Sequence, residues 1–237
     1  AAASKTTLPV AVSTARAAVA GLSDRVARKT ITWALVDTSS GSLGFYDLDA
    51  ARRELDGFPR PGKRQIAAER VLETAGKTPA EIVAWFGGQE PQSPQGAMAL
   101  ASAFRSLGRQ ADAAELIRGW WRNRSFEADV QRTMLTRFAD VLTVDDHIRR
   151  MEILLFGAQG PAARDMIPLL PADQQALAQA RMALRQNAGS ALAQADALPA
   201  SVAASPGLAF ERAAYYRRKG QDAQAIALLS AFPTDLA

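Results

Sequence analysis

Two matching segments constrain the fold of this chain more than any other feature of its sequence. Residues 104–117 read FRSLGRQADAAELI and residues 216–229 read YRRKGQDAQAIALL, so that Gly108 aligns with Gly220. After each glycine, small and then large apolar residues recur at the spacing of one helix face. A glycine can take the left-handed conformation that ends a helix, and small residues beside the turn let the next helix pack closely. Each segment therefore predicts a helical hairpin.

The hairpin pattern recurs in weaker form between these two copies. Residues 154–163 read LLFGAQGPAA and give a looser third copy around Gly157, and Gly189 marks a candidate fourth copy. From Gly108 onward these glycines are separated by 49, 32 and 31 residues, against about 34 in a tetratricopeptide repeat. Because the match is partial, the sequence predicts an all-α fold, an α-α superhelix of stacked helical hairpins that is tetratricopeptide-like.

Helix-favouring residues dominate the chain, and prolines punctuate the periodic segments. We predict helices near residues 9–20, 23–36, 47–56, 64–75, 79–86, 95–107, 111–122, 127–140, 144–156, 161–168, 172–186, 189–197, 207–218 and 222–230. Residues 37–46 and 87–95 are predicted loops. Residues 1–86 are predicted to form an irregular N-terminal helical section and residues 87–237 a regular hairpin superhelix, together making one continuous superhelical domain.

Composition excludes several classes of protein. The 237 residues include no cysteine, which rules out disulfides and thiolate metal sites. The formal charge is +4, from 28 basic and 24 acidic residues that are spread along the chain, so we expect no nucleic-acid partner. No apolar run approaches the roughly 20 residues that cross a bilayer, which predicts no transmembrane segment. The opening Ala1-Ala2-Ala3-Ser4-Lys5 is typical of a mature end after signal-peptide removal, or of a cloned fragment.

His147 is the only histidine, and it follows Asp145 and Asp146. One interpretation is a base or metal ligand flanked by acids. The other is a residue in the first turn of a helix that Thr143 and Asp146 cap reciprocally. We favour the structural interpretation, because one histidine alone completes neither a catalytic triad nor a zinc site. No metal and no cofactor are predicted.

Tryptophans and paired carboxylates are the other residues of interest. Trp120-Trp121 could offer aromatic faces to a sugar, but Trp120 lies on an apolar helix stripe, so core roles are favoured for this pair and for Trp33 and Trp85. The carboxylate pairs are Asp145/Asp146, Asp47/Asp49 and Glu69/Glu73. Glycosidic cleavage needs a positioned acid. The spacing of these carboxylates is instead typical of ordinary surface pairing with neighbouring arginines. No catalytic residue is predicted, and the substrate-binding residues stay unassigned.

Several blocks, read in order, carry a resemblance to a known family. They are Ala84-Trp85-Phe86 before a proline-rich loop, ASAFRSLG at 101–108 with AAELI at 113–117 and Trp121, LTVDDHIRRM at 142–151 with Leu154-Leu155, and PGLAFERAAYYRRKG at 206–220. Over residues 82–229 they resemble the N-terminal helical domain of soluble lytic murein transglycosylases, the bacterial muramidase superhelical domain. Residues 28–33 and 55–59 extend the resemblance more thinly toward the N-terminus.

The resemblance implies a U- or ring-shaped α-superhelical domain of a periplasmic enzyme. Such a lyase cleaves peptidoglycan between N-acetylmuramic acid and N-acetylglucosamine without hydrolysis and leaves a 1,6-anhydro product. The family's lysozyme-like catalytic domain carries a Glu-Ser acid motif, a Gly-Leu-Met-Gln stretch and an Ala-Tyr-Asn-Ala-Gly stretch, and none occurs in this chain. The chain alone is therefore expected to be inactive and periplasmic, with glycan strands and other cell-wall proteins as partners.

Three functions follow from this reading. The leading hypothesis is a non-catalytic domain that holds or positions the glycan strand for a catalytic domain outside this chain. The alternative is a stand-alone tetratricopeptide-like scaffold for a protein or peptide. A weaker third hypothesis is a structural domain that self-associates through exposed hairpin ends.

Overall fold

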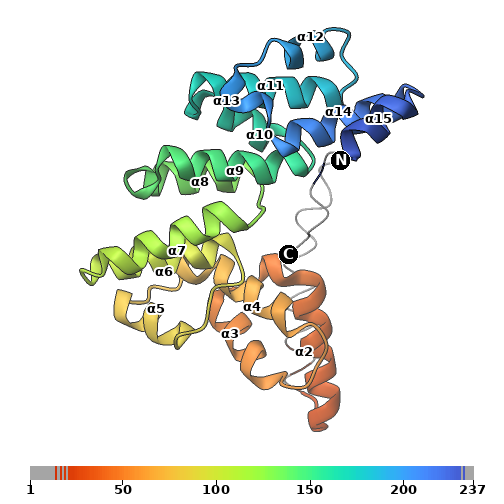
Figure 1. Cartoon of the computed structure of the whole chain (residues 1–237). Helices are drawn as coiled ribbons and strands as arrows, with labels where there is room; N and C mark the ends of the chain where they lie inside the picture. The colour runs from red at the N-terminus through yellow and green to blue at the C-terminus, as the bar shows by residue number, and fades with distance from the viewer. Residues whose placement is uncertain (1–13, 15–16, 18, 20, 231, 233–237) are drawn as a thin grey trace, which may run out of the picture. The chain divides into compact units, whose positions relative to one another are not determined.

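The computed structural model describes residues 14, 17, 19, 21–230 and 232. In this part of the chain all regular structure is helical, and helices adjacent in the sequence pack on one another (Figure 1). The α-helices are α2 Arg25–Ser39, α3 Phe45–Glu54, α4 Pro61–Arg70, α5 Pro79–Phe86, α6 Pro94–Ser106, α7 Gln110–Asn123, α8 Ala128–Phe138, α9 Val144–Phe156, α10 Pro161–Met166, α11 Ala172–Arg185, α12 Ala191–Asp196, α13 Ala200–Ala203, α14 Pro206–Arg218 and α15 Asp222–Leu229. The all-α prediction is confirmed, while most of the predicted helix 9–20 lies outside the described residues.

The predicted loop at 37–46 was too long. Helix α2 continues to Ser39, a 3-10 turn spans Ser40–Ser42, and α3 already begins at Phe45. The last turn of α2 is held because Thr38 Oγ1 donates to the Ala34 carbonyl at 2.7 Å, and Lys63 Nζ donates to the Asp37 carbonyl at 2.6 Å. The short helix α13 was not predicted.

Prolines mark the first turns of five helices. They open α4, α5, α6, α10 and α14, where the missing N–H has no intrahelical partner to lose. A reciprocal cap between Thr78 and Glu81 also fixes the start of α5. The interpretation of prolines as helix punctuation is confirmed, and α4 begins three residues earlier than predicted because Pro61 opens it.

The two predicted glycine turns have the expected backbone. Gly108 and Gly220 have φ values of 76° and 69°, in the left-handed region. The weaker copies differ, because Asn187 (φ 54°) and Gln159 (φ 51°) take the left-handed position that the sequence reading gave to Gly189 and Gly157. Asparagine tolerates this region better than most residues that carry a Cβ, so its hairpin turn does not need a glycine.

Packing contacts divide the chain into two compact units, Ala1–Ile117 and Arg118–Ala237. The core of the first unit is built around Leu48, Leu55 and Leu72, and that of the second includes Leu184 and Leu208. The boundary predicted between residues 86 and 87 falls inside the first unit. It was predicted to separate an irregular helical section from regular hairpins, and that difference in regularity stays a prediction.

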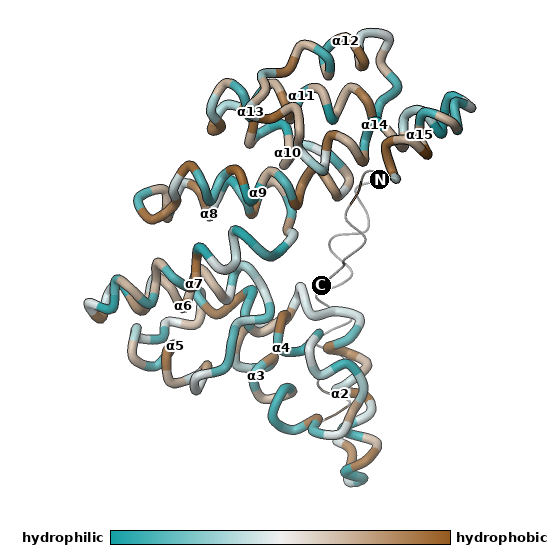
Figure 2. The backbone as a smooth tube through the Cα atoms, viewed as in Figure 1, coloured by the Kyte–Doolittle hydropathy of each residue, from teal (hydrophilic) through white to brown (hydrophobic). Residues whose placement is uncertain are grey.

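Hydrophobic and hydrophilic residues interleave along the helices of both units (Figure 2). This is the pattern of helices that bury one stripe and leave the opposite stripe in water. Within the described residues, no helix has both the length and the hydropathy needed to cross a membrane.

Candidate ligand-binding site

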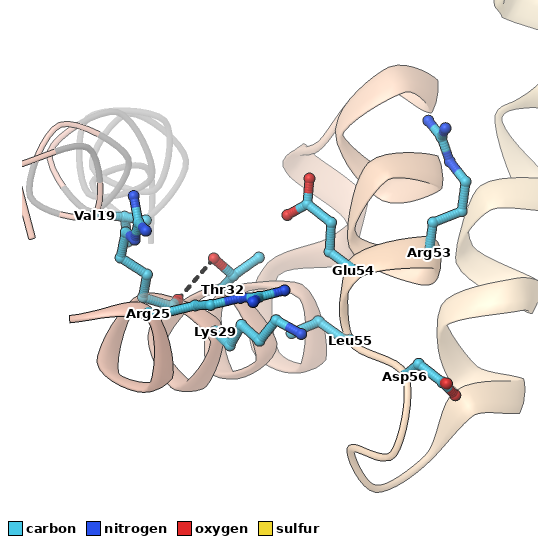
Figure 3. Close-up of a pocket in the computed structure, with 9 residues that line it drawn as sticks. Val19, Arg25, Lys29, Thr32, Arg53, Glu54, Leu55 and Asp56 are labelled. Carbon is cyan, nitrogen blue, oxygen red and sulfur yellow. Dashed lines mark hydrogen bonds between the residues drawn. The ribbon is translucent and has the colours of Figure 1, made fainter. Parts of the chain in front are cut away.

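A cavity of about 610 Å³ lies between helices α2 and α3 in the first unit. Figure 3 shows side chains of α2 on one side of it and the end of α3 on the other. Its lining residues are Val19, Arg25, Arg28, Lys29, Thr32, Arg53, Glu54, Leu55 and Asp56. None of these was singled out as a site residue from the sequence, so the site emerges only from the packing of the two helices.

Helix α2 places its basic residues on one stripe because of their spacing. Arg28, Lys29 and Thr32 follow Arg25 by three, four and seven positions, which brings them onto one face. Asp24 fixes the start of this helix, since its Oδ1 accepts from the backbone N–H of Val26 at 2.7 Å. The stripe is thus presented by a capped helix rather than by a loop.

Another face of α2 anchors it to the rest of the unit. Val36 is buried in the core, and Trp33 packs against that core while its Nε1 donates to the Pro59 carbonyl at 3.2 Å. Trp33 is half-buried rather than fully buried, which agrees in part with its predicted core role. This anchoring leaves the basic stripe facing the cavity.

The cavity carries an excess of positive charge. Four of its lining residues are basic and two are acidic. Arg53 is paired with Asp49 at 3.2 Å, whereas Arg25, Arg28 and Lys29 have no carboxylate within ion-pair distance among the described residues. Cations that lack an internal partner favour an anionic ligand, and their exposure makes the attraction sensitive to salt.

Asp49 is the ion-pair partner of Arg53, which lines the cavity. Contrary to the surface pairing predicted for it, its side chain is largely buried and accepts from Trp85 Nε1 at 2.7 Å and from Arg52 Nη2 at 3.0 Å. Burial alone would raise the pKa of Asp49, but the hydrogen bonds from Trp85 and Arg52 bring it below its ordinary value. This carboxylate stays ionised and structural, so it is not poised as a general acid.

In the second unit, Asp146 organises the start of α9. It forms the predicted reciprocal cap with Thr143, whose backbone N–H donates to its Oδ2 at 2.7 Å. It is also fully buried, paired with Arg122 and 3.7 Å from Arg118 Nε. Burial raises the pKa of Asp146, and the hydrogen bonds from Thr143 and Arg122 more than offset this and lower it. The prediction of a surface carboxylate was therefore wrong.

His147 is half-buried against Trp121. Its ring lies edge-on to Trp121 with 5.8 Å between ring centroids, and both Trp120 and Trp121 are buried, as a core role requires. Among the described residues, Trp121 Nε1 and His147 Nδ1 have no hydrogen-bond partner. Neither tryptophan offers a face to a ligand in this arrangement.

We expect the single histidine to titrate below the ordinary histidine value of about 6.5. Burial lowers the pKa of His147, and the nearby Asp146 only partly opposes this. Proton NMR of the one imidazole in the chain measures the midpoint directly. Asp146→Asn should lower the midpoint further, because it removes the opposing charge. A wild-type midpoint at or above 6.5 would contradict this environment.

Glu69 is the third carboxylate that the sequence placed on the surface and the structure buries. Its Oε2 accepts from the Ser93 N–H at 2.7 Å and from Ser93 Oγ at 2.6 Å, and Gln65 Nε2 donates to its Oε1. Gly96 lies so close that a Cβ there would overlap the carboxylate. Glu69 thus ties α4 to the start of α6, while Glu73 stays exposed on a separate turn. These residues do not form an acid pair around an open cleft.

No group of three or more His, Asp or Glu residues in the described part of the chain is placed to hold a metal ion. The cavity offers charge and shape to a ligand, while Asp49, Asp146 and Glu69 are engaged within the fold. Comparisons with family models, with curated proteins and with solved structures found no match. The signal that could have found the cavity is the Arg-x-x-Arg-Lys spacing directly after the capping Asp24.

Proposed function

We propose that this chain is a non-catalytic binding domain of a periplasmic peptidoglycan lytic transglycosylase, built as a tetratricopeptide-like superhelix. It holds the glycan strand for a catalytic domain that lies outside this chain. The observation that carries the proposal is the stripe of cations on α2, unpaired within the described residues and facing a cavity of about 610 Å³. Peptidoglycan strands with stem peptides bear peptide carboxylates, which such a stripe attracts.

Two further observations support a holding role over a catalytic one. The block of the sequence with the most specific resemblance to the family, residues 142–151, folds into a capped helix start in which Asp146 is fully buried. Of the carboxylates considered for glycosidic cleavage, Asp49 and Asp146 are held in ion pairs and Glu69 in buried hydrogen bonds. A domain of this kind contributes affinity and orientation, and the acid that protonates the glycosidic oxygen comes from elsewhere.

Reversing one charge of the stripe is expected to weaken binding of soluble, peptide-bearing peptidoglycan strands about tenfold in low salt, which corresponds to about 1.4 kcal/mol. Lys29→Glu and Arg25→Glu test this by isothermal titration calorimetry. The difference from wild type should shrink as salt is raised, because these side chains lie at the surface.

Arg70→Glu is the matched control, because Arg70 is exposed on α4, outside the residues that line the cavity. It changes the net charge equally but should leave the affinity within about twofold of wild type. Equal losses of affinity for Lys29→Glu and Arg70→Glu would contradict the assignment of the cavity as the binding site. Wild-type binding of free peptides with no affinity for glycan would instead favour the protein- or peptide-binding scaffold.

A further inference from the structure

An exposed pair of aromatic rings lies on the second unit, far in sequence from the cavity. Phe156 ends α9 and is 55% exposed, and Phe210 lies in the second turn of α14 and is 44% exposed. Their ring centroids are 6.0 Å apart and the rings are inclined at 52°. Single exposed apolar residues are common on protein surfaces, but two rings in contact form a continuous apolar patch.

An arginine of α11 supports the ring of Phe156 from behind. Arg181 is fully buried, with its guanidinium carbon 5.0 Å from the centre of the Phe156 ring. Its Nη1 donates to both oxygens of Glu152 at 2.7 Å. A Cβ at Gly207 would overlap the same guanidinium, so Arg181 passes directly beside the start of α14. The ring of Phe156 therefore rests on a rigid charged support.

Arg185, one turn further along α11, connects the two helices that carry the rings. It donates to the carbonyl of Gly157, which follows Phe156, and to the carboxylate of Glu211, which follows Phe210. Glu211 is itself buried, whereas the Arg185 side chain is 29% exposed. The two helices that carry the rings are thus tied together before any ligand arrives, which reduces the ordering cost of binding.

We propose that Phe156 and Phe210 form a stacking platform for an uncharged pyranose ring, with Glu152 accepting hydrogen bonds from its hydroxyls. An aromatic face packs on the apolar C–H face of a sugar, and a neighbouring carboxylate supplies the polar contact that orients it. Glu152 lies one turn before Phe156 on the same face of α9, and it is about two-fifths exposed although Arg181 binds it.

A sugar fits this patch better than a protein partner does. A stable protein interface needs roughly 800 Å² on each side, whereas the apolar part here is two rings beside an ion pair. The proposed platform is separate from the basic cavity, and binding to it does not depend on a charge on the ligand. Its binding should therefore be insensitive to salt, which separates it experimentally from the function proposed for the cavity.

An uncharged β-1,4-linked oligomer of N-acetylglucosamine is the probe, with saturation-transfer NMR to detect contact and titration calorimetry to measure affinity. Wild-type protein should bind it equally in low and high salt. Phe156→Ala and Phe210→Ala should each weaken binding about fivefold to tenfold, and Phe156→Tyr should retain it because the aromatic face remains. Glu152→Gln should weaken it by a smaller factor, since the amide oxygen can still accept.

Leu107→Ala is the matched control, because Leu107 is 46% exposed at the end of α6 in the first unit, whereas both rings lie in the second. Its affinity for the oligomer should equal that of wild type. Circular dichroism checks that each variant is folded. If Phe156→Ala does not fold, Phe210→Ala alone tests the proposal. Absence of saturation transfer from the wild-type protein to the oligomer, or equal weakening by Leu107→Ala, would overturn the proposal.

Discussion

Asp146→Ala is expected to lower the free energy of unfolding of the second unit by about 2–4 kcal/mol. The substitution removes the cap of α9 and leaves Arg122 without its buried carboxylate partner. Urea denaturation followed by tryptophan fluorescence measures the effect, since the buried Trp121 lies against the same helix. The expected loss stays below that of a fully buried pair because Arg122 is partly exposed and can be hydrated after the substitution.

Asp145→Ala is the control for this prediction. Asp145 occupies the same first turn but is exposed, so its loss removes only an interaction with the helix dipole of about 0.3–1 kcal/mol. The two variants should also differ in acid. Folding lowers the pKa of Asp146, so its contribution is present above the unfolded value of about 3.9 and is lost as pH falls through the folded value. Similar destabilisation by both variants would contradict the central role of Asp146.

Gly207→Ala is expected to destabilise the second unit by about 2–3 kcal/mol. A methyl group at this position would overlap the guanidinium of Arg181. That guanidinium is fully buried and bonded to both oxygens of Glu152 at 2.7 Å, so it cannot move without breaking these bonds. Thermal unfolding monitored by circular dichroism should show a lower transition temperature.

Gly119→Ala tests the same change of residue without the overlap. Gly119 lies within α7 in the same unit, and a Cβ there would meet no atom within 4 Å. Alanine should stabilise this helix by about 0.5–1 kcal/mol, because it loses less conformational entropy on folding than glycine does. The two substitutions should therefore have opposite signs. Stabilisation by Gly207→Ala would show that Arg181 is not confined as described.

Local features of the fold were predictable because the residues that make them lie close together in the sequence. The cap between Thr143 and Asp146 spans three residues, and the turns at Gly108 and Gly220 depend on one residue each. The turn at Asn187 was placed two residues away, at Gly189, because glycine is the stronger signal although asparagine also tolerates positive φ. Sequence reasoning therefore located the helices well and some turns less well.

Features made by contacts between distant residues could not be predicted in the same way. Glu69 appeared to be a surface acid beside Arg70, but its partner Ser93 lies 24 residues away and buries it. Arg181 gave no signal of burial, because the glycine that makes room for it is Gly207 on another helix. The basic cavity likewise requires α2 and α3 to pack together before its lining residues become neighbours.

Incubation of the purified chain with isolated peptidoglycan sacculi tests the central claim most directly. After sedimentation, the pellet is analysed for bound protein and the supernatant for 1,6-anhydro-muropeptides. A holding domain without catalytic groups predicts that the chain sediments with the sacculi, that less of the Lys29→Glu variant does so, and that no anhydro product is released. A chain that stays in the supernatant, or release of anhydro-muropeptides by the pure chain, would contradict the account.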